Sequence, residues 1–240
     1  MTAQLPDRVR SEDSHFWADV TKGVRIYAQT PRLRGLMVME AAVAAAGAMV
    51  FVNTVVLVQA RLRLGDEAVA LAFAGFGVGS ILAAFVLPRI LKWLADRTVM
   101  IGGAALMVAS VALVPLVGSL TNLIALWAVI GFGFSLTQTP IGRIINRSAR
   151  EADRGAVFAA QFALSHACWL VTYPLAGWVG AGVGLDVAAL ALAAIGGVSV
   201  ALVLRLWPAD DQTTIPHDHP DLPKGHPHLA EHGSSHAHVV

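Results

Sequence analysis

Charge, cysteine and the strict polar–apolar alternation of barrel strands are all scarce in this chain of 240 residues. Charged residues make up 14% of it, hydrophobic residues 56%, and the mean hydropathy is +0.64. A soluble domain carries about 25% charged residues, so this chain cannot build a surface that faces water on all sides. The single cysteine, Cys168, excludes an intrachain disulfide.

Sequence signatures of catalysis and of nucleotide binding are missing as well. The chain has no Walker-type phosphate loop, no H-E-x-x-H, and no nucleophile with a base at a recognisable spacing. Residues 75–79 (GFGVG) lie inside an apolar run with no strand before them, so they are not a dinucleotide loop. We therefore predict that the chain is not an enzyme, requires no cofactor and binds no nucleic acid.

The apolar residues come in six long runs. A helix of about 20 residues crosses a ~30 Å hydrocarbon core, and only helices or closed barrels satisfy the backbone there. Because the alternation of barrel strands is absent, we predict an all-α membrane protein with six transmembrane helices. The predicted spans are 35–59, 67–88, 98–118, 120–141, 155–180 and 184–207.

Lysine and arginine are distributed unevenly around these runs. Fifteen of the 17 lie in the N-terminal segment, in the loops after the second and fourth spans, or at the C-terminal end, whereas Arg61 and Arg63 lie on the other side. Basic loops remain cytoplasmic. We predict a multi-pass protein of the inner cell membrane, in contact with lipid, with both termini in the cytoplasm.

The chain divides into three parts. Residues 1–34 are charged throughout, so we expect no cleaved signal peptide. Apolar residues at helical spacing within 14–29 predict either an amphipathic helix on the membrane surface or a short solvated helix. Residues 35–207 form the transmembrane domain. Residues 208–240 are rich in Pro, Asp, His and Gly, so we predict a disordered cytoplasmic tail.

Polar side chains distinguish the spans from one another. The third and sixth spans are almost purely apolar and are expected to face lipid, whereas the other four are expected to face inward; of these, the first, fourth and fifth carry polar side chains. This 3+3 pattern is typical of the inverted repeats of transporters. In the second span, Gly75 and Gly79 have the G-x-x-x-G spacing that permits close helix approach.

The inward spans supply the candidate substrate or coupling residues. A carboxylate such as Glu40 is costly in lipid and therefore a functional candidate, although it could also reach the interface or pair with a loop arginine. His166 could carry a proton or bind a soft cation with Cys168, or its polar stripe could serve only interhelical hydrogen bonds. The candidates are Glu40, Asn53, Gln138, Gln161, Ser165, His166 and Thr172.

Seven of the nine histidines lie in the tail. Paired imidazoles on a flexible segment suit nickel or zinc, so we predict that the tail collects Ni or Zn weakly; a solubilising tail with incidental metal binding is the alternative. The predicted metal ligands are His217, His219, His226, His228, His232, His236 and His238.

Four stretches resemble the C-terminal six-helix half of a major facilitator superfamily transporter. They are TPRLRGLMVMEAAVAAAGAMVFVNTVV (30–56), LPRILKWLADRTVMIGGAALM (87–107), TPIGRIINRSAREADRGAVFAAQFAL (139–164) and TYPLAGWVGAGVG (172–184). Two loops hold the Asp-Arg pairs common in that family, at 96–97 and 153–154, although Lys92 stands where the loop signature has glycine. The tail is similar to those of histidine-rich bacterial metal efflux proteins, the nickel-resistance group among them.

The resemblance implies a secondary transporter of half size, exporting a small solute or metal cation against protons. Because the family has twelve helices in two halves, the chain is expected to be truncated or to pair with a second six-helix bundle. That bundle would be a parallel copy or a separately encoded N-terminal half, facing Glu40 and the 161–172 stripe. The alternative is a non-transporting six-helix subunit or fragment whose tail buffers metal.

Overall fold

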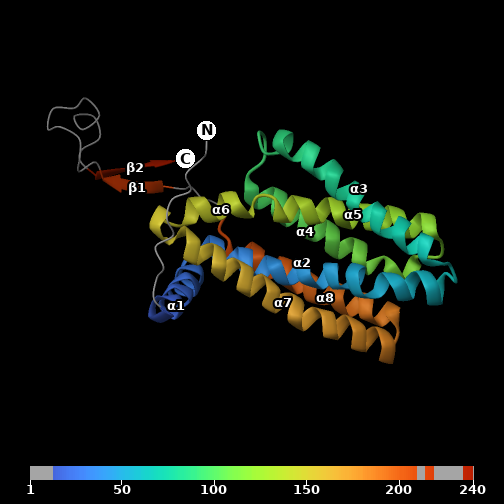
Figure 1. The fold of residues 1–240 in the computed structure, drawn as a ribbon. Helices are drawn as coiled ribbons and strands as arrows, with labels where there is room; N and C mark the ends of the chain where they lie inside the picture. The colour runs from blue at the N-terminus through green and yellow to red at the C-terminus, as the bar shows by residue number, and fades with distance from the viewer. Residues whose placement is uncertain (1–12, 210–213, 219–234, 240) are drawn as a thin grey trace, which may run out of the picture. The chain divides into compact units, whose positions relative to one another are not determined.

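The structure, a computed structural model, describes residues 13–209, 214–218 and 235–239 (Figure 1). The α-helices are α1 (Asp13–Gln29), α2 (Pro31–Val56), α3 (Asp66–Ile90), α4 (Asp96–Ala112), α5 (Leu120–Gln138), α6 (Ile141–Ser148), α7 (Arg154–Gly182) and α8 (Leu185–Leu206). A π-helical turn extends α2 over Leu57–Arg61, and 3₁₀ turns lie at Val114–Leu116 and Glu151–Asp153.

Five helical segments in the described part of the chain are long and apolar enough to cross a membrane. They are Pro31–Arg61, Asp66–Ile90, Leu120–Ser148, Glu151–Gly182 and Leu185–Leu206. The helix at the third predicted span, α4, has 17 residues. At 1.5 Å per residue it is about 25 Å long, shorter than a ~30 Å hydrocarbon core. The prediction of a helical multi-pass membrane protein is confirmed for the five segments.

Local sequence explains where several helices begin. Pro31 opens α2, where its missing N–H costs no hydrogen bond. The Ser119 hydroxyl caps α5 by accepting the N–H of Asn122 at 3.2 Å. Between α7 and α8, Gly184 has a φ of 118°, a conformation that glycine adopts without steric cost. This glycine allows a very short connection between two antiparallel helices.

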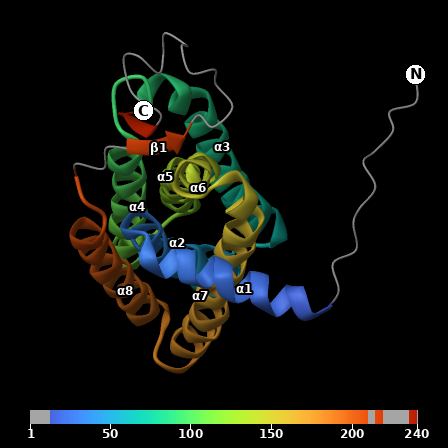
Figure 2. The ribbon, with the colours of Figure 1, turned by 90° about the vertical axis from the view of Figure 1, so that its left-hand side faces the viewer.

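The long helices pack in two groups, and α4 belongs to both. Helix α2 packs against α7, α8 and α4, while α5 packs against α3 and α4, and α4 also contacts α8. Figure 2, a view along the bundle, shows α2 enclosed by these neighbours. Between the two groups, the indole N–H of Trp127 on α5 donates to the hydroxyl of Thr54 on α2 at 2.8 Å. The core therefore forms around α2.

Exposure of the spans differs in part from the sequence prediction. Helix α2 is the most buried of the five apolar segments, as expected for an inward span, but α7 is the least buried, followed by α3. Large apolar side chains of α7 lie on the surface, among them Phe162, Leu170 and Trp178. The side of α7 that carries Gln161 and Thr172 packs on α2, and much of the rest of this helix is exposed in the bundle.

The predicted close approach of the second span occurs at the contact between α3 and α5. A Cβ atom at Gly75 would lie 2.7 Å from the carbonyl oxygen of Ile124, and one at Gly79 would overlap the carbonyl of Ala128. On the other side of the contact, a Cβ atom at Gly131 would overlap the carbonyl of Phe76. The two helix backbones therefore touch, as small residues at i and i+4 permit.

Residues Pro208–Val240 form a separate unit. Within it, β1 (Thr214–Asp218) and β2 (Ser235–Val239) pair antiparallel, with His217 opposite His236. The backbone groups of the two strands satisfy each other across the ladder, and the disorder predicted for the tail as a whole stays a prediction. For the remaining positions of the tail, including His219, His226, His228 and His232, the prediction lies outside the described residues.

Candidate functional site

The candidate site is a buried carboxylate held by amides from two other helices. Glu40 on α2 is 3% exposed. The Gln138 side chain, at the end of α5, directs its Nε2 to the two carboxylate oxygens at 3.2 and 3.3 Å. The Nε2 of Gln161 on α7 donates to Oε1 at 3.0 Å. The structure thus brings together three predicted site residues from three separate spans.

A fourth residue, Tyr27 of α1, fixes the orientation of one amide. Its phenol O–H donates to Oε1 of Gln161, so the NH₂ end of that amide faces Glu40. Burial raises the pKa of the Tyr27 phenol far above its usual range, and the nearby Glu40 charge adds to the shift. The phenol therefore keeps its proton and remains a donor. An ionised carboxylate only accepts hydrogen bonds, so the whole chain of donors points toward Glu40.

Opposing effects act on the charge of Glu40. Amide donors stabilise the carboxylate, but burial disfavours a charge, and no cationic side chain among the described residues forms an ion pair with it. Glu40 neither reaches the solvent nor pairs with a loop arginine in this part of the chain. A carboxylate placed in this way can take up and release a proton, or a cation that replaces the amide donors.

Two further candidates attach α7 to α2 away from this cluster. The Nδ2 of Asn53 lies 3.4 Å from the carbonyl oxygen of Ala176, and the Thr172 hydroxyl donates to the carbonyl of Ala44 at 3.2 Å. Asn53 is 13 residues beyond Glu40 on α2, about 20 Å along the helix. Both side chains are buried, and their contacts are those of interhelical packing.

His166 and Ser165 do not join the cluster. The His166 ring is exposed and packs at a tilt against Phe162 with ring centroids 3.9 Å apart, and its Nδ1 lies 2.7 Å from the Phe162 carbonyl. The partly exposed Ser165 donates to the same carbonyl at 3.0 Å. At 3.6 residues per turn, His166 lies about 140° around α7 from Gln161. It therefore points away from α2, toward an open groove of about 650 Å³ that also contains Trp169, Leu170 and Tyr173.

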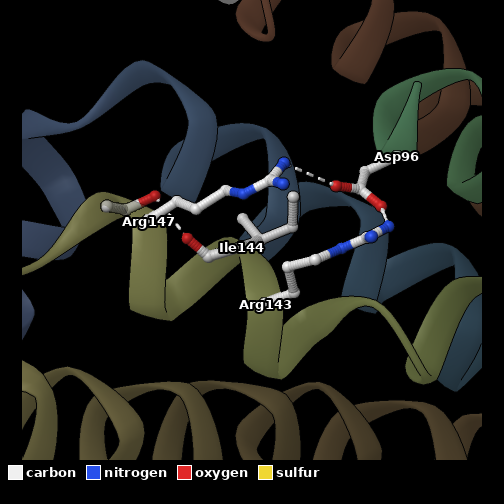
Figure 3. A network of polar contacts seen from close by, with 5 residues as sticks. Asp96, Arg143, Ile144 and Arg147 are labelled. Carbon is white, nitrogen blue, oxygen red and sulfur yellow. Dashed lines mark hydrogen bonds and ion pairs between the residues drawn. The ribbon is translucent and has the colours of Figure 1, made fainter. Parts of the chain in front are cut away.

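A second polar cluster centres on Asp96, at the start of α4 (Figure 3). Asp96 is 8% exposed and forms ion pairs with two arginines of α6, Arg143 and Arg147, the latter at 3.2 Å. The arginines are four residues apart, so they lie on one side of the short helix. The neighbouring Arg97 points elsewhere and donates to the carbonyl of Trp207 at 2.8 Å. These first two residues of α4 link the helix to α6 and to the end of α8.

The second loop that has an Asp-Arg pair is used in a similar way. Asp153 lies just before α7 and forms an ion pair with Lys22 of α1. One residue further along α1, Gly23 packs directly on the backbone of Ala156. With Tyr27, these contacts hold α1 along the end of α7 that carries Gln161.

Replacing Asp96 with Asn is expected to lower the free energy of unfolding by about 1–2 kcal/mol, because it removes the shared partner of two guanidinium groups. The loss is smaller than for a fully buried pair, since both arginines are partly exposed. The matched control is Asp186→Asn, which breaks a pair with Arg61 (2.5 Å) in which Asp186 is 55% exposed. Thermal unfolding in mild detergent should separate the variants, and equal shifts in the two would contradict a structural role for the Asp96 cluster.

The fold and the site define a multi-pass helical membrane protein with an acidic group buried among its spans. A family profile described as Major Facilitator Superfamily matches residues 37–231. The chain belongs to this superfamily, which confirms the resemblance of its helical stretches to the superfamily. Members of the superfamily are membrane transporters and not enzymes. No curated protein matches the chain.

Proposed function

We propose that the chain forms half of a secondary transporter in which Glu40 couples transport to protons. The supporting observation is the Glu40 network, in which a nearly inaccessible carboxylate binds two neutral amides and no cation in the described residues. Ionisable groups inside membrane domains mark ion and proton pathways. Because Gln138, Gln161 and Glu40 belong to three helices, protonation of Glu40 would weaken contacts that hold these helices together.

The proposal includes six spans that cross the inner cell membrane, with both termini on the cytoplasmic side. Helix α4 and the 3₁₀ turn that follows extend over residues 96–116, and 21 residues are about the length that spans a hydrocarbon core. The ends of the helices that carry 15 of the 17 basic residues would lie inside. Basic residues Arg61 and Arg63 would mark the outer side.

We further propose an inverted 3+3 repeat, in which α2, α3 and α4 correspond to α5, α7 and α8. The helix pairing supports it. Helix α2 packs on α7 and α8 of the other triplet, while α5 packs on α3 and α4 of the first, and the two third helices contact each other. A pseudo-twofold axis between α4 and α8 would exchange these pairs, as in transporters built from inverted repeats.

A second six-helix bundle is proposed as the partner, either a parallel copy of this chain or a separately encoded N-terminal half. The sequence suggests that a partner covers Glu40 and the 161–172 stripe. In the structure, Glu40, Gln161 and Thr172 are already buried within the bundle, so the partner is proposed for a different reason. The support comes from α3 and α7, the least buried spans, and from the apolar groove beside His166. A partner there would place His166 and Tyr173 at the contact between the two bundles.

For the substrate we propose efflux of a metal cation or another small solute, with the histidine-rich tail as an accessory collector of nickel or zinc. The pairing of His217 with His236 in the strand register, and the likeness of the tail to those of metal efflux proteins, support metal. Within the described residues, no group of three or more potential metal ligands occurs. The alternative is a six-helix subunit that transports nothing and whose tail buffers metal.

Proton movement in proteoliposomes distinguishes the two functions. With the full chain reconstituted and a pH-sensitive dye inside, adding Ni²⁺ or Zn²⁺ should change the internal pH if the chain exchanges metal for protons. Removing residues 208–240 should leave this exchange in place, because the proposed coupling residue is Glu40. If neither metal nor protons move while the tail still binds metal in calorimetry, the metal-buffering alternative is correct.

A further inference from the structure

A groove of about 430 Å³ opens at the end of the bundle that carries the basic loops. It is lined by Ala84, Leu87, Pro88, Leu91, Lys92, Thr139 and Arg143. The apolar members recur at three- and four-residue spacing along the last turns of α3, so they form one stripe on that helix. Lys92, Thr139 and Arg143 are the polar members. The groove thus combines an apolar floor with a cationic rim.

Positive charge is in excess at this rim. No acidic side chain lines the groove, and in the described part of the chain the exposed Lys92 ammonium forms no ion pair. Arg143 pairs with Asp96, but that single carboxylate is shared with Arg147 (Figure 3). One negative charge therefore faces two guanidinium groups, and Lys92 adds a third positive charge. An anion bound between Lys92 and Arg143 would balance this excess.

Exposed aromatic side chains place the groove at the level of lipid head groups. Trp93, next to Lys92, is 87% exposed, and Phe85, one turn from Arg89 on α3, is 70% exposed. Indole rings favour the boundary between hydrocarbon and head groups, because the ring is apolar and its N–H needs a polar partner. Trp93 marks that boundary, so the apolar stripe between 84 and 91 extends from it into the hydrocarbon.

We propose that this groove binds an anionic glycerophospholipid. Its phosphate lies between Lys92 and Arg143, and an acyl chain follows the stripe on α3. Basic pockets at the cytoplasmic ends of transmembrane helices bind such head groups. A free phosphate would use the rim alone and leave the apolar floor uncovered. The choline group of a zwitterionic lipid would find no acidic partner among the lining residues. The site does not depend on the proposed transport function.

Native mass spectrometry of the full detergent-purified chain tests the site with phosphatidylglycerol and phosphatidylcholine as probes. We expect phosphatidylglycerol to be retained preferentially, and Lys92→Gln to weaken its binding about fivefold, the usual contribution of one basic side chain at an anionic surface. The matched control is Arg34→Gln, which removes one exposed positive charge from the same end of the bundle but does not line the groove. Lys92→Arg should retain the lipid.

Three outcomes would overturn the proposal. Equal retention of the two lipids would show that the head-group charge is not recognised. Equal losses in Lys92→Gln and Arg34→Gln would indicate a diffuse charge effect and no local site. Displacement of the lipid by inorganic phosphate at millimolar concentration would show that the rim binds a free anion. Because Lys92 is exposed, its variants should fold like the wild type, which their unfolding temperatures would verify.

Discussion

Replacing Glu40 with Gln is expected to reduce transport driven by a pH gradient on the order of a hundredfold, at the low end of what a positioned proton-transfer group contributes. Glutamine has nearly the shape of glutamate but cannot take up a proton. It would occupy the same place between Gln138 and Gln161. The change therefore removes the ionisable group and largely preserves the packing. Exchange of substrate across membranes without a pH gradient should persist, because that process needs no net proton movement.

Two further variants make the Glu40 test specific. Glu40→Asp keeps a carboxylate on a shorter side chain and should retain part of the gradient-driven transport. Glu67→Gln removes the same charge at an exposed position at the start of α3 and should behave like the wild type. Full gradient-driven transport in Glu40→Gln would exclude Glu40 as the coupling group. A loss of folded protein, seen by gel filtration, would instead assign the residue to stability.

The positions of the long helices along the chain were largely predictable from the sequence. Each of the six apolar runs contains one helix, and five of these helices are long and apolar enough to cross a membrane, because about 20 consecutive apolar residues have few alternatives to a membrane helix. The direction in which a span faces was less predictable. For α7, the polar residues predict an inward face, but His166 lies around the helix from Gln161 and is exposed.

Some residues of the candidate site were predictable from the sequence, but the contacts between them were not. Glu40, Gln138 and Gln161 are conspicuous as polar groups in apolar helices, yet their contact depends on how α2, α5 and α7 pack. Tyr27 was missed because it lies in the segment before the first span, on the apolar side of an amphipathic helix. The structure shows that α1 inserts this side chain among the spans.

For the Asp96 cluster, the sequence indicates the individual residues but not the ion pairs between them. The Asp-Arg pair at 96–97 is a loop feature that the sequence shares with the superfamily. Its partners, Arg143 and Arg147, are spaced four residues apart after the fourth span, which is the spacing of one helix face. Sequence alone could not link the two loops, because the link depends on α4 and α5 lying side by side.

The second large effect is expected at the contact between α3 and α5, where Gly79→Ala should lower the free energy of unfolding by about 1–3 kcal/mol, the cost of overpacking a tight interface. The added methyl group would overlap the backbone carbonyl of Ala128. A backbone carbonyl cannot rotate away as a side chain can, so the two helices must separate. Their separation would also strain the hydrogen bond from Ser80 to the Gly131 carbonyl, which is 3.0 Å long. Unfolding of the purified protein by heat or by a denaturing detergent measures the loss.

Gly77→Ala on the same helix is the matched control for this prediction. A Cβ atom there meets nothing within 4 Å, so the methyl group adds no clash. Alanine favours a helix interior over glycine by roughly 0.8–1.0 kcal/mol, and Gly77→Ala should therefore be neutral or slightly stabilising. The two variants share the same chemical change and the same helix, two residues apart, and differ in what the methyl group meets. If both were destabilised alike, the cause would be altered backbone behaviour of α3, and the close approach of α3 and α5 would not be what makes Gly79 necessary.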